Sequence, residues 1–211
     1  MSSALENTRN YARPRYPAHL AESRRLADGT HIVIRPIHPD DDRLEREFIN
    51  GLSGESRYNR LLSARKLTPE EIRNLTRIDY EREMAFIAVS ISAGRTIQLG
   101  VARYVREAAG AGAEFAIVVG DPWQRKGLGS LLLEALLAHA RAAGIERLHG
   151  IRLASNDGMH RLARKLGFAS RADPLDATVR QLEKVLVTPA AAAHANAAYA
   201  VSAANDETGA R

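Results

Sequence analysis

The fold is decided by a stretch that reads Ala113-Glu114-Phe115-Ala116-Ile117-Val118-Val119, then Gly120-Asp121-Pro122-Trp123, then Gln124-Arg125-Lys126-Gly127-Leu128-Gly129-Ser130. Its first seven residues are rich in β-branched and aromatic side chains, which is typical of a buried strand. From Leu128 the apolar residues recur at helical spacing, and Gly144 is placed to end the helix. The sequence therefore predicts a strand, a glycine-containing turn and a helix that begins between Gly127 and Ser130.

The predicted turn has the properties of an anion site. Gly127 and Gly129 carry no side chains, so a ligand can come close to the main chain. The first amides of a helix have no partner within the helix and carry partial positive charge, to which Arg125 and Lys126 add. A pyrophosphate would suit this place. An ordinary turn whose glycines only ease packing accounts for the same residues, and this interpretation is the usual one for an isolated Gly-x-Gly.

Two other phosphate-binding motifs are excluded by spacing. A Walker loop has four residues between its glycines, whereas here only Leu128 separates Gly127 from Gly129. The dinucleotide-binding fingerprint has a third glycine three residues after the second, and position 132 is leucine.

Motifs along the chain resemble those of the GNAT N-acetyltransferase superfamily. They are Gln124-x-x-Gly127-x-Gly129 after the Ala113-Glu114-Phe115 strand, Asn156-Asp157-Gly158-Met159 with Leu162-Ala163-Arg164-Lys165-Leu166-Gly167-Phe168, and Ile34-Arg35-Pro36-Ile37 with Asp40-Asp41-Asp42. The resemblance covers about residues 31–187. It implies a GNAT α/β fold, with a central mixed, mostly antiparallel sheet of six to seven strands flanked by helices.

Within the superfamily, the chain most resembles the Pat-type protein lysine acyltransferases. The residues that carry this are Leu52-Ser53-x-x-Ser56-Arg57-Tyr58-x-Arg60 and Asp79-Tyr80-x-x-Glu83-Met84-Ala85. Pat-type domains often occur fused to an acyl-CoA synthetase-like or a cyclic-nucleotide-binding region. We expect neither region in this chain, because its length leaves no room for them.

The resemblance implies that acetyl-CoA, or another acyl-CoA, is the cosubstrate. The strand amides around Val118 would bind the pantetheine amide and polarise the thioester carbonyl. Asn156 would contact the cofactor, although capping of the following helix explains this residue as well. The expected cofactor-binding residues are Ile117, Val118, Val119, Gln124, Arg125, Lys126, Gly127, Leu128, Gly129, Ser130 and Asn156.

Glu114 is the candidate catalytic base. An amine is protonated at neutral pH and must lose a proton before it attacks a thioester, and a nearby carboxylate can accept that proton. Glu114 is the sole acid among six apolar residues, so we expect partial burial that raises its pKa. Its position also matches the glutamate that serves as base in several GNAT enzymes. An exposed residue or an ion-pair partner is the structural alternative.

The chain departs from the family pattern at Ala163. Many GNAT enzymes have a tyrosine seven residues after the motif asparagine, where it protonates the leaving thiolate, although Pat-like sequences commonly have a small residue there. Either the thiolate leaves unassisted, or another group such as Tyr58 or His160 serves. Packing is the simpler role for Tyr58 and Tyr80, and a helical histidine is more often a surface residue.

Composition narrows the class of protein. The chain has 211 residues, 45% of them hydrophobic and 26% charged, as in a soluble globular protein. It has no cysteine, which excludes disulfides and thiolate metal sites, and we expect no metal. The formal net charge is +5, but the basic residues are scattered over the sequence, and no aromatic–basic array indicates nucleic-acid binding. No apolar run is long enough to cross a membrane and no secretory signal is evident, so we expect a cytoplasmic protein.

Three regions are expected: a flexible arm at 1–29 with at most one helical turn, an acyltransferase domain at 30–188, and an alanine-rich, disordered tail at 189–211. Helices are expected at about 40–52, 55–62, after the capping sequence Thr68-Pro69-Glu70-Glu71, at 128–142 and at 158–166. Strands are expected at 30–37, 84–92, 95–105, 113–119, 147–153, from Phe168, and at 178–187.

The sequence thus predicts an N-acetyltransferase that moves an acetyl group from acetyl-CoA to a primary amine, with a protein lysine as the favoured acceptor. A small-molecule amine is the alternative acceptor, and a non-catalytic acyl-CoA-sensing module is the alternative outside enzymes. The sequence leaves open a homodimer.

Overall fold

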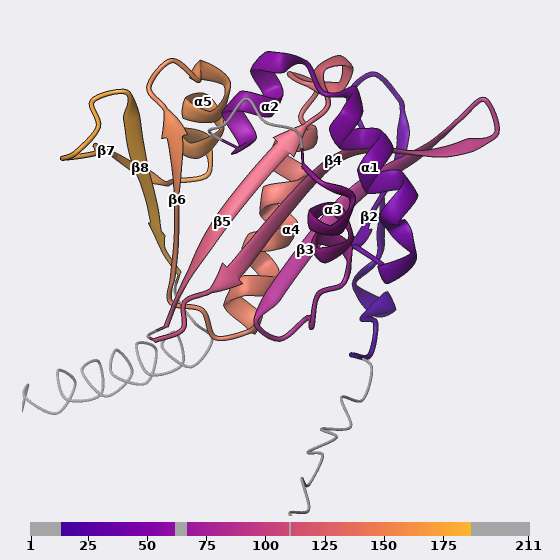
Figure 1. Cartoon of the computed structure of the whole chain (residues 1–211), viewed down its shortest axis with the longest axis horizontal. Coiled ribbons are helices and arrows are strands. Elements are labelled where there is room, and N and C mark those ends of the chain that lie inside the picture. The colour runs from indigo at the N-terminus through magenta and orange to yellow at the C-terminus, as the bar shows by residue number, and fades with distance from the viewer. Residues whose placement is uncertain (1–13, 62–66, 110, 187–211) are drawn as a thin grey trace, which may run out of the picture.

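The structure is a computed structural model that describes residues 14–61, 67–109 and 111–186. The first thirteen residues of the expected arm and the expected tail at 189–211 lie outside these ranges. Within them the chain forms one sheet with helices on both faces (Figure 1).

The sheet has eight strands in the order β1-β2-β3-β4-β5-β6-β8-β7. Only β5 and β6 are parallel neighbours, and all other neighbouring pairs are antiparallel. This confirms the mixed, mostly antiparallel sheet, with one strand more than the expected upper number. The strands are β1 (Glu22–Arg25), β2 (His31–Pro36), β3 (Glu83–Ser92), β4 (Arg95–Arg106), β5 (Gly112–Val119), β6 (Arg147–Leu153), β7 (Ala169–Ala172) and β8 (Val179–Val185).

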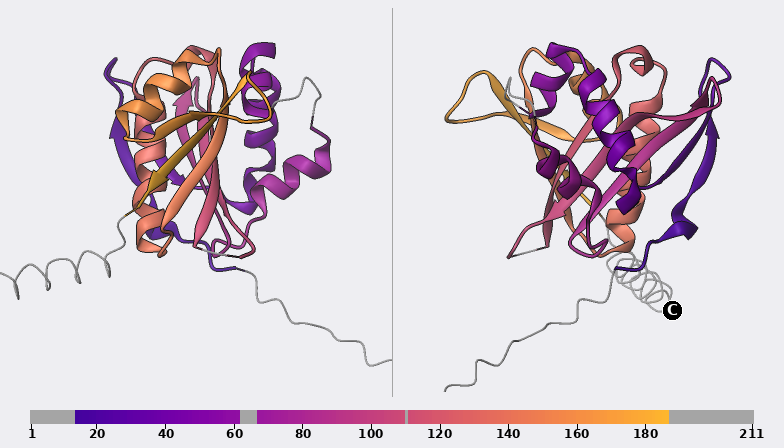
Figure 2. Two further views of the ribbon diagram at one scale, coloured as in Figure 1. Left: turned by 90° about the vertical axis from the view of Figure 1, so that its left-hand side faces the viewer. Right: turned by 45° about the vertical axis from the view of Figure 1, so that its right-hand side comes forward.

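The helices divide between the two faces of the sheet (Figure 2). One face carries α4 and α5, and leucines of α4 such as Leu132 and Leu136 are fully buried against it. The other face carries α1, α2 and α3, and a second core forms there around Phe48 and Ile72. The helices are α1 (Asp42–Gly51), α2 (Gly54–Leu61), α3 (Pro69–Thr76), α4 (Leu128–Ala142) and α5 (Asp157–Lys165), with short 3₁₀ helices η1 (Ala18–Leu20), η2 (Pro39–Asp41) and η3 (Asp121–Trp123).

The expectation of a loose arm does not hold for the residues just before the first predicted strand. Residues 22–25 form β1, which pairs with β2, and Leu26 is buried in the core. Because all four side chains of β1 are exposed, the strand shows no apolar alternation, and its sequence gave no strand pattern. Backbone pairing and the burial of Leu26 hold this segment in place.

The central strand β5 presents different side chains to the two faces. Ala113 and Phe115 are buried in the core that α4 covers. Because successive side chains of a strand point to opposite faces, Glu114 projects to the side of α1, α2 and α3. Gly144, with φ of +74°, ends α4 as the sequence predicted.

The parallel pairing of β5 with β6 is short. It joins three residue pairs, the last of them Glu114 with His149, and the two strands then diverge (Figure 1). At the point of separation a Cβ atom on Gly150 would lie 2.8 Å from the carbonyl oxygen of Phe115, so only glycine allows this approach. From residue 115 to residue 119, β5 pairs with β4 on one edge, and no strand of the described ranges pairs with its other edge.

Candidate active site

The turn between β5 and α4 places two free amides at the start of the helix. Gly127 has φ of +88° and Arg125 has φ of +60°, and this left-handed backbone turns the chain so that α4 begins at Leu128. The amides of Leu128 and Gly129 have no hydrogen-bond partner in the described part of the chain. Together with the positive end of the helix dipole, they have the properties of an anion site, and the binding of an anion there stays a prediction.

The same turn is tied to α2 and to the loop before it by a cluster of hydrogen bonds. Asp121 Oδ1 accepts hydrogen bonds of 2.7 Å from the hydroxyls of Ser53 and Ser56. Burial alone would raise the pKa of Asp121, but these bonds and one from the Ser53 amide outweigh it, and the pKa is lowered. Gln124 Nε2 donates to Ser56 Oγ at 3.0 Å and to the Val119 carbonyl at 3.1 Å. Gln124, expected at the cofactor, therefore fixes the turn in this structure.

The cations around the turn differ in their partners. Arg125 is exposed, and no ion pair engages it within the described residues. Lys126 Nζ lies 3.0 Å from Asp28 and 4.8 Å from the centre of the Trp123 ring, so the β1–β2 turn holds it. Lys165, which the sequence analysis did not select, donates from α5 to Ser130 Oγ at 3.0 Å. Its charge thus lies at the first turn of α4.

The expected cofactor residues of β5 and α4 meet at one place. A Cβ atom on Gly129 would lie 3.7 Å from Val119 Cγ2 and 3.3 Å from Leu162 Cδ2, so the end of β5, the start of α4 and the side of α5 converge there. Ile117 and Val118 precede Val119 on the edge without a partner strand. An open strand edge that leads to free amides and cations fits a ligand with amides along its length and phosphates at its end, as an acyl-CoA has.

Glu114 lies at the other end of β5 and is exposed. The burial that the sequence predicted for this carboxylate is therefore not present, because the face of β5 on which it projects is open at this position. Its strand neighbours are Val105 of β4 and His149 of β6. On the α2 side lies Arg60, where burial and Arg103 lower the pKa to about 10 while attraction to Glu45 and Glu114 opposes the decrease.

The residues of the second motif take structural positions. Asn156 Oδ1 accepts a hydrogen bond of 2.9 Å from the Met159 amide and so caps α5. Ala163 is buried in the core, so no side chain from this position reaches the site. His160 Nδ1 lies 3.2 Å from Arg152 Nη2, and Tyr58 is 45% exposed. Of the two suggested proton donors, only Tyr58 is without a hydrogen-bond partner in the described chain.

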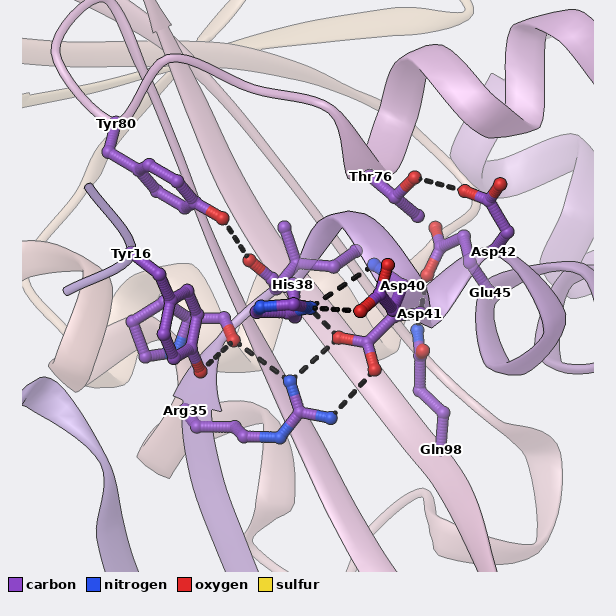
Figure 3. Close-up of polar contacts among 12 residues, drawn as sticks. Tyr16, Arg35, His38, Asp40, Asp41, Asp42, Glu45, Thr76, Tyr80 and Gln98 are labelled. Carbon is purple, nitrogen blue, oxygen red and sulfur yellow. Dashed lines mark hydrogen bonds and ion pairs between the residues drawn. The ribbon is translucent and has the colours of Figure 1, made fainter. Parts of the chain in front are cut away.

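Tyr80 belongs to a polar network under α1 and not to an open site (Figure 3). Its hydroxyl donates to the Ile37 carbonyl at 2.7 Å, and the ring of Tyr16 lies edge-on to it. Deeper in, Glu45 accepts a hydrogen bond of 2.5 Å from Gln98 Nε2. Burial raises the pKa of Glu45, although Arg103 and Gln98 oppose the increase.

The described residues offer neither a metal site nor a membrane-spanning helix, and three residues near the candidate site were not selected from the sequence. The described residues contain no group of three or more side chains that could hold a metal ion. None of their helices is long and apolar enough to cross a bilayer. Sequence reasoning did not select Lys165, nor His149, which pairs with Glu114, nor Glu107, which lies 2.8 Å from His149 Nε2. The alternation of buried and exposed residues in β6 could have predicted that His149 faces the open side of the sheet. It could not have predicted that His149 pairs with Glu114.

Comparison with known proteins agrees with this geometry. Residues 56–168 match the model of the acetyltransferase (GNAT) family. The chain belongs to the GNAT family. An acetyltransferase of Pseudomonas aeruginosa is 35% identical over 161 residues, which make up 76% of this chain and 86% of that protein. GNAT enzymes use an acyl-CoA as donor, so the family assignment supports an acetyltransferase that uses acetyl-CoA.

Two Pat-type GNAT proteins are also similar. The acetyltransferase Pat of Mycolicibacterium smegmatis is 34% identical over 143 residues, which cover 66% of this chain and 41% of that protein. The chain therefore spans less than half of that relative. The crystal structure of the GNAT domain of S. lividans PAT has a TM-score of 0.73 at 29% identity, and the match covers 82% of this chain and all of that domain. The expected GNAT fold is confirmed.

Proposed function

We propose that this GNAT enzyme transfers an acetyl group from acetyl-CoA to the side-chain amine of a protein lysine. The observation that carries the proposal is the arrangement along β5. One end of the strand leads to the free amides of α4, and Glu114 stands at the other end, where β5 and β6 begin to diverge.

The residues of β5 and α4 would hold the donor. The amides of Leu128 and Gly129 and the charge of Lys165 bind the phosphates, and the open edge from residue 115 to residue 119 hydrogen-bonds to the amides of the ligand. When bound, the thioester supplies an activated acyl group. Backbone amides near Val118 orient and polarise its carbonyl.

Glu114 would accept a proton from the acceptor ammonium. A primary amine is protonated at neutral pH, and proton transfer to a positioned carboxylate releases the lone pair that attacks the acyl carbon. The exposure of Glu114 to solvent suits this role in two ways, because an acceptor can approach the carboxylate and the accepted proton can return to water.

Similarity to Pat-type proteins favours a protein lysine as acceptor. The experiment incubates the chain with acetyl-CoA and a panel of lysine peptides, matched peptides with arginine in place of lysine, and small amines. Thiol release and peptide mass report transfer, and calorimetry reports donor binding. Acetylation of lysine peptides but not of arginine peptides supports the proposal. Transfer to small amines alone favours the alternative acceptor, and binding without any transfer favours a sensing module.

A further inference from the structure

His149 lies beside the proposed base. It pairs in parallel register with Glu114, and paired residues of neighbouring strands project to the same face. Leu148, the residue before it, is fully buried on the α4 side, so His149 faces the side of Glu114. No helix of the described residues covers β6 and β8 on this side (Figure 1), and 34% of the His149 side chain is exposed.

Glu107 lies against the histidine ring, and Arg147 lies against Glu107. Glu107 Oε1 lies 2.8 Å from His149 Nε2 and 3.2 Å from Arg147 Nη2. Glu107 itself packs over Gly112, where a Cβ atom would overlap its carboxylate. Nε2 is buried against Glu107 at ion-pair distance, without the geometry of a hydrogen bond. Nδ1 makes no hydrogen bond with the described residues, so it is the ring nitrogen that an acceptor amine can reach.

The ring also lines a cavity of about 300 Å³ on the open face. Its wall includes Glu107, His149, Ile151, Gln181 and Glu183. Ile151 is 49% exposed, so the cavity has an apolar side along which the methylene chain of an aminoalkyl group can lie. The amine at the end of such a chain would reach the row that holds His149 and Glu114.

We infer that His149 is a second catalytic group for the acceptor amine, oriented by Glu107 and Arg147, which act as positioning residues. The inference rests on the proposed function and adds to it. A primary ammonium has three N–H bonds and the amide product has one, so two protons must leave the nitrogen. Glu114 takes one proton and His149 Nδ1 takes the other as the carbon–nitrogen bond forms. The electron pair of the broken carbon–sulfur bond stays on sulfur, which gains one of these protons to form the thiol, and water takes the other.

The charges that face the ring from neighbouring elements are mixed. Glu114 of β5, Glu183 of β8 and Glu107 are acidic neighbours of the ring, and Arg147 of β6 and Arg171 of β7 are basic ones. The ring is thus placed among groups of both signs. Because an imidazole changes charge within the range of an ordinary pH–rate profile, its role can be measured there.

The test compares His149→Gln and Glu107→Gln with His31→Gln, which replaces an exposed histidine of β2 near the opposite edge of the sheet. Steady-state acetylation of a lysine peptide is measured from pH 6 to 9, with acetyl-CoA affinity and melting temperature measured alongside. We expect His149→Gln to lower kcat by about 10²-fold, at the lower end of general acid–base effects, and to remove one limb of the profile. Donor affinity should stay unchanged. Glu107→Gln should shift that limb with a smaller loss of rate.

Three outcomes overturn the inference. A His149→Gln enzyme with the rate and pH profile of His31→Gln would show that the histidine only packs against Glu107. If His149→Gln fails to fold, Glu107→Gln decides, and an unchanged limb in that variant rejects the inference. A wild-type chain that binds acetyl-CoA and acetylates no amine would reject the proposed function as well. The first two results leave that function standing.

Discussion

The two ends of β5 offer different kinds of groups for the two tasks that we propose for them. At its C-terminal end the contacts offered to a ligand come from the main chain, with the amides of Leu128 and Gly129 and the open strand edge. At its N-terminal end they come from side chains, with Glu114, His149 and Glu107 from β5, β6 and the β4–β5 connection. A main-chain site is encoded locally by glycines and spacing. A side-chain site depends on which distant strands become neighbours.

Substitution at the side-chain end should have the largest effect. Glu114→Gln keeps the size of the side chain but cannot accept a proton, so the acetylation rate should fall by roughly 10²–10⁴-fold at or below neutral pH. Acetyl-CoA affinity should barely change, because the proposed donor site lies at the other end of β5. Saturating acetyl-CoA and a discontinuous assay of peptide mass provide the measurement.

Glu134→Gln is the matched control, since Glu134 is an exposed carboxylate on α4. A near-normal rate for Glu114→Gln would make Glu114 structural and remove the division of tasks between the two ends.

Substitution at the main-chain end should alter binding and not the chemical step. In Gly129→Val the added side chain would crowd Leu162 and cover the amide, so the Kd for acetyl-CoA should rise by about tenfold or more, or at least 1.4 kcal/mol. Calorimetry gives the Kd, and a melting curve shows whether the fold persists. Gly51→Val is the control, because nothing lies within 4 Å of a Cβ atom there. Equal affinity in a folded Gly129→Val protein would remove this turn from the donor site.

Lys165 and Lys126 are two cations near the turn before α4, and their substitution should affect donor binding to different degrees. Lys165→Met removes a charge from the first turn of α4, and we expect a two- to fivefold weaker Kd for acetyl-CoA, equivalent to about 0.4–1 kcal/mol. Lys126→Met should cost less, because Asp28 already pairs with that lysine. The difference should shrink as salt is raised. An equal or larger effect at Lys126 would mean that Lys126 leaves Asp28 for the ligand.

The half-buried His139 of α4 should make the stability of the fold depend on pH. This effect must be distinguished from the pH dependence of the acetylation rate. Burial, with Arg106 and His19 adding to it, lowers the pKa of His139, whose Nδ1 lies 3.0 Å from the Tyr104 hydroxyl. The unfolded chain therefore binds more protons below the ordinary histidine pKa of about 6.5, and stability falls as pH drops through that value.

The expected decrease in melting temperature from pH 7 to pH 5 that is due to His139 is on the order of 2–4 °C. His139→Asn keeps a polar atom near the Tyr104 hydroxyl but does not titrate, so its melting temperature should depend less on pH. A dependence equal to that of the wild type would assign the acid sensitivity to other groups.

The main-chain end was predictable from sequence because its determinants are adjacent. Gly127 and Gly129 with the apolar pattern after Leu128 predicted the start of α4, and the capping sequence at Thr68 predicted α3. Strand β6 was predicted at its observed bounds. The strand β1 was not, since its four exposed side chains carry no pattern and only its pairing with β2 defines it.

The side-chain end was predictable only in part. Glu114 was selected by a family motif, but its exposure depends on which helices cover the open face. His149 and Glu107 were missed because they belong to segments 42 residues apart that only the folded sheet brings together. Lys126 was expected from the sequence to bind the donor, but in the folded chain it pairs with Asp28. Asp28 lies far from Lys126 in the sequence, so this pairing could not be predicted either.

The short β5–β6 seam has a consequence for local stability. Three residue pairs join one half of the sheet, β1 to β5, to the other half, so opening this seam breaks few backbone hydrogen bonds. Amides of residues 115–119 that point away from β4 should exchange with solvent deuterium faster than those that point toward it. A ligand on this edge acts as a substitute strand and slows that exchange. At a concentration of 100 times its Kd it also stabilises the whole fold by about 2.7 kcal/mol.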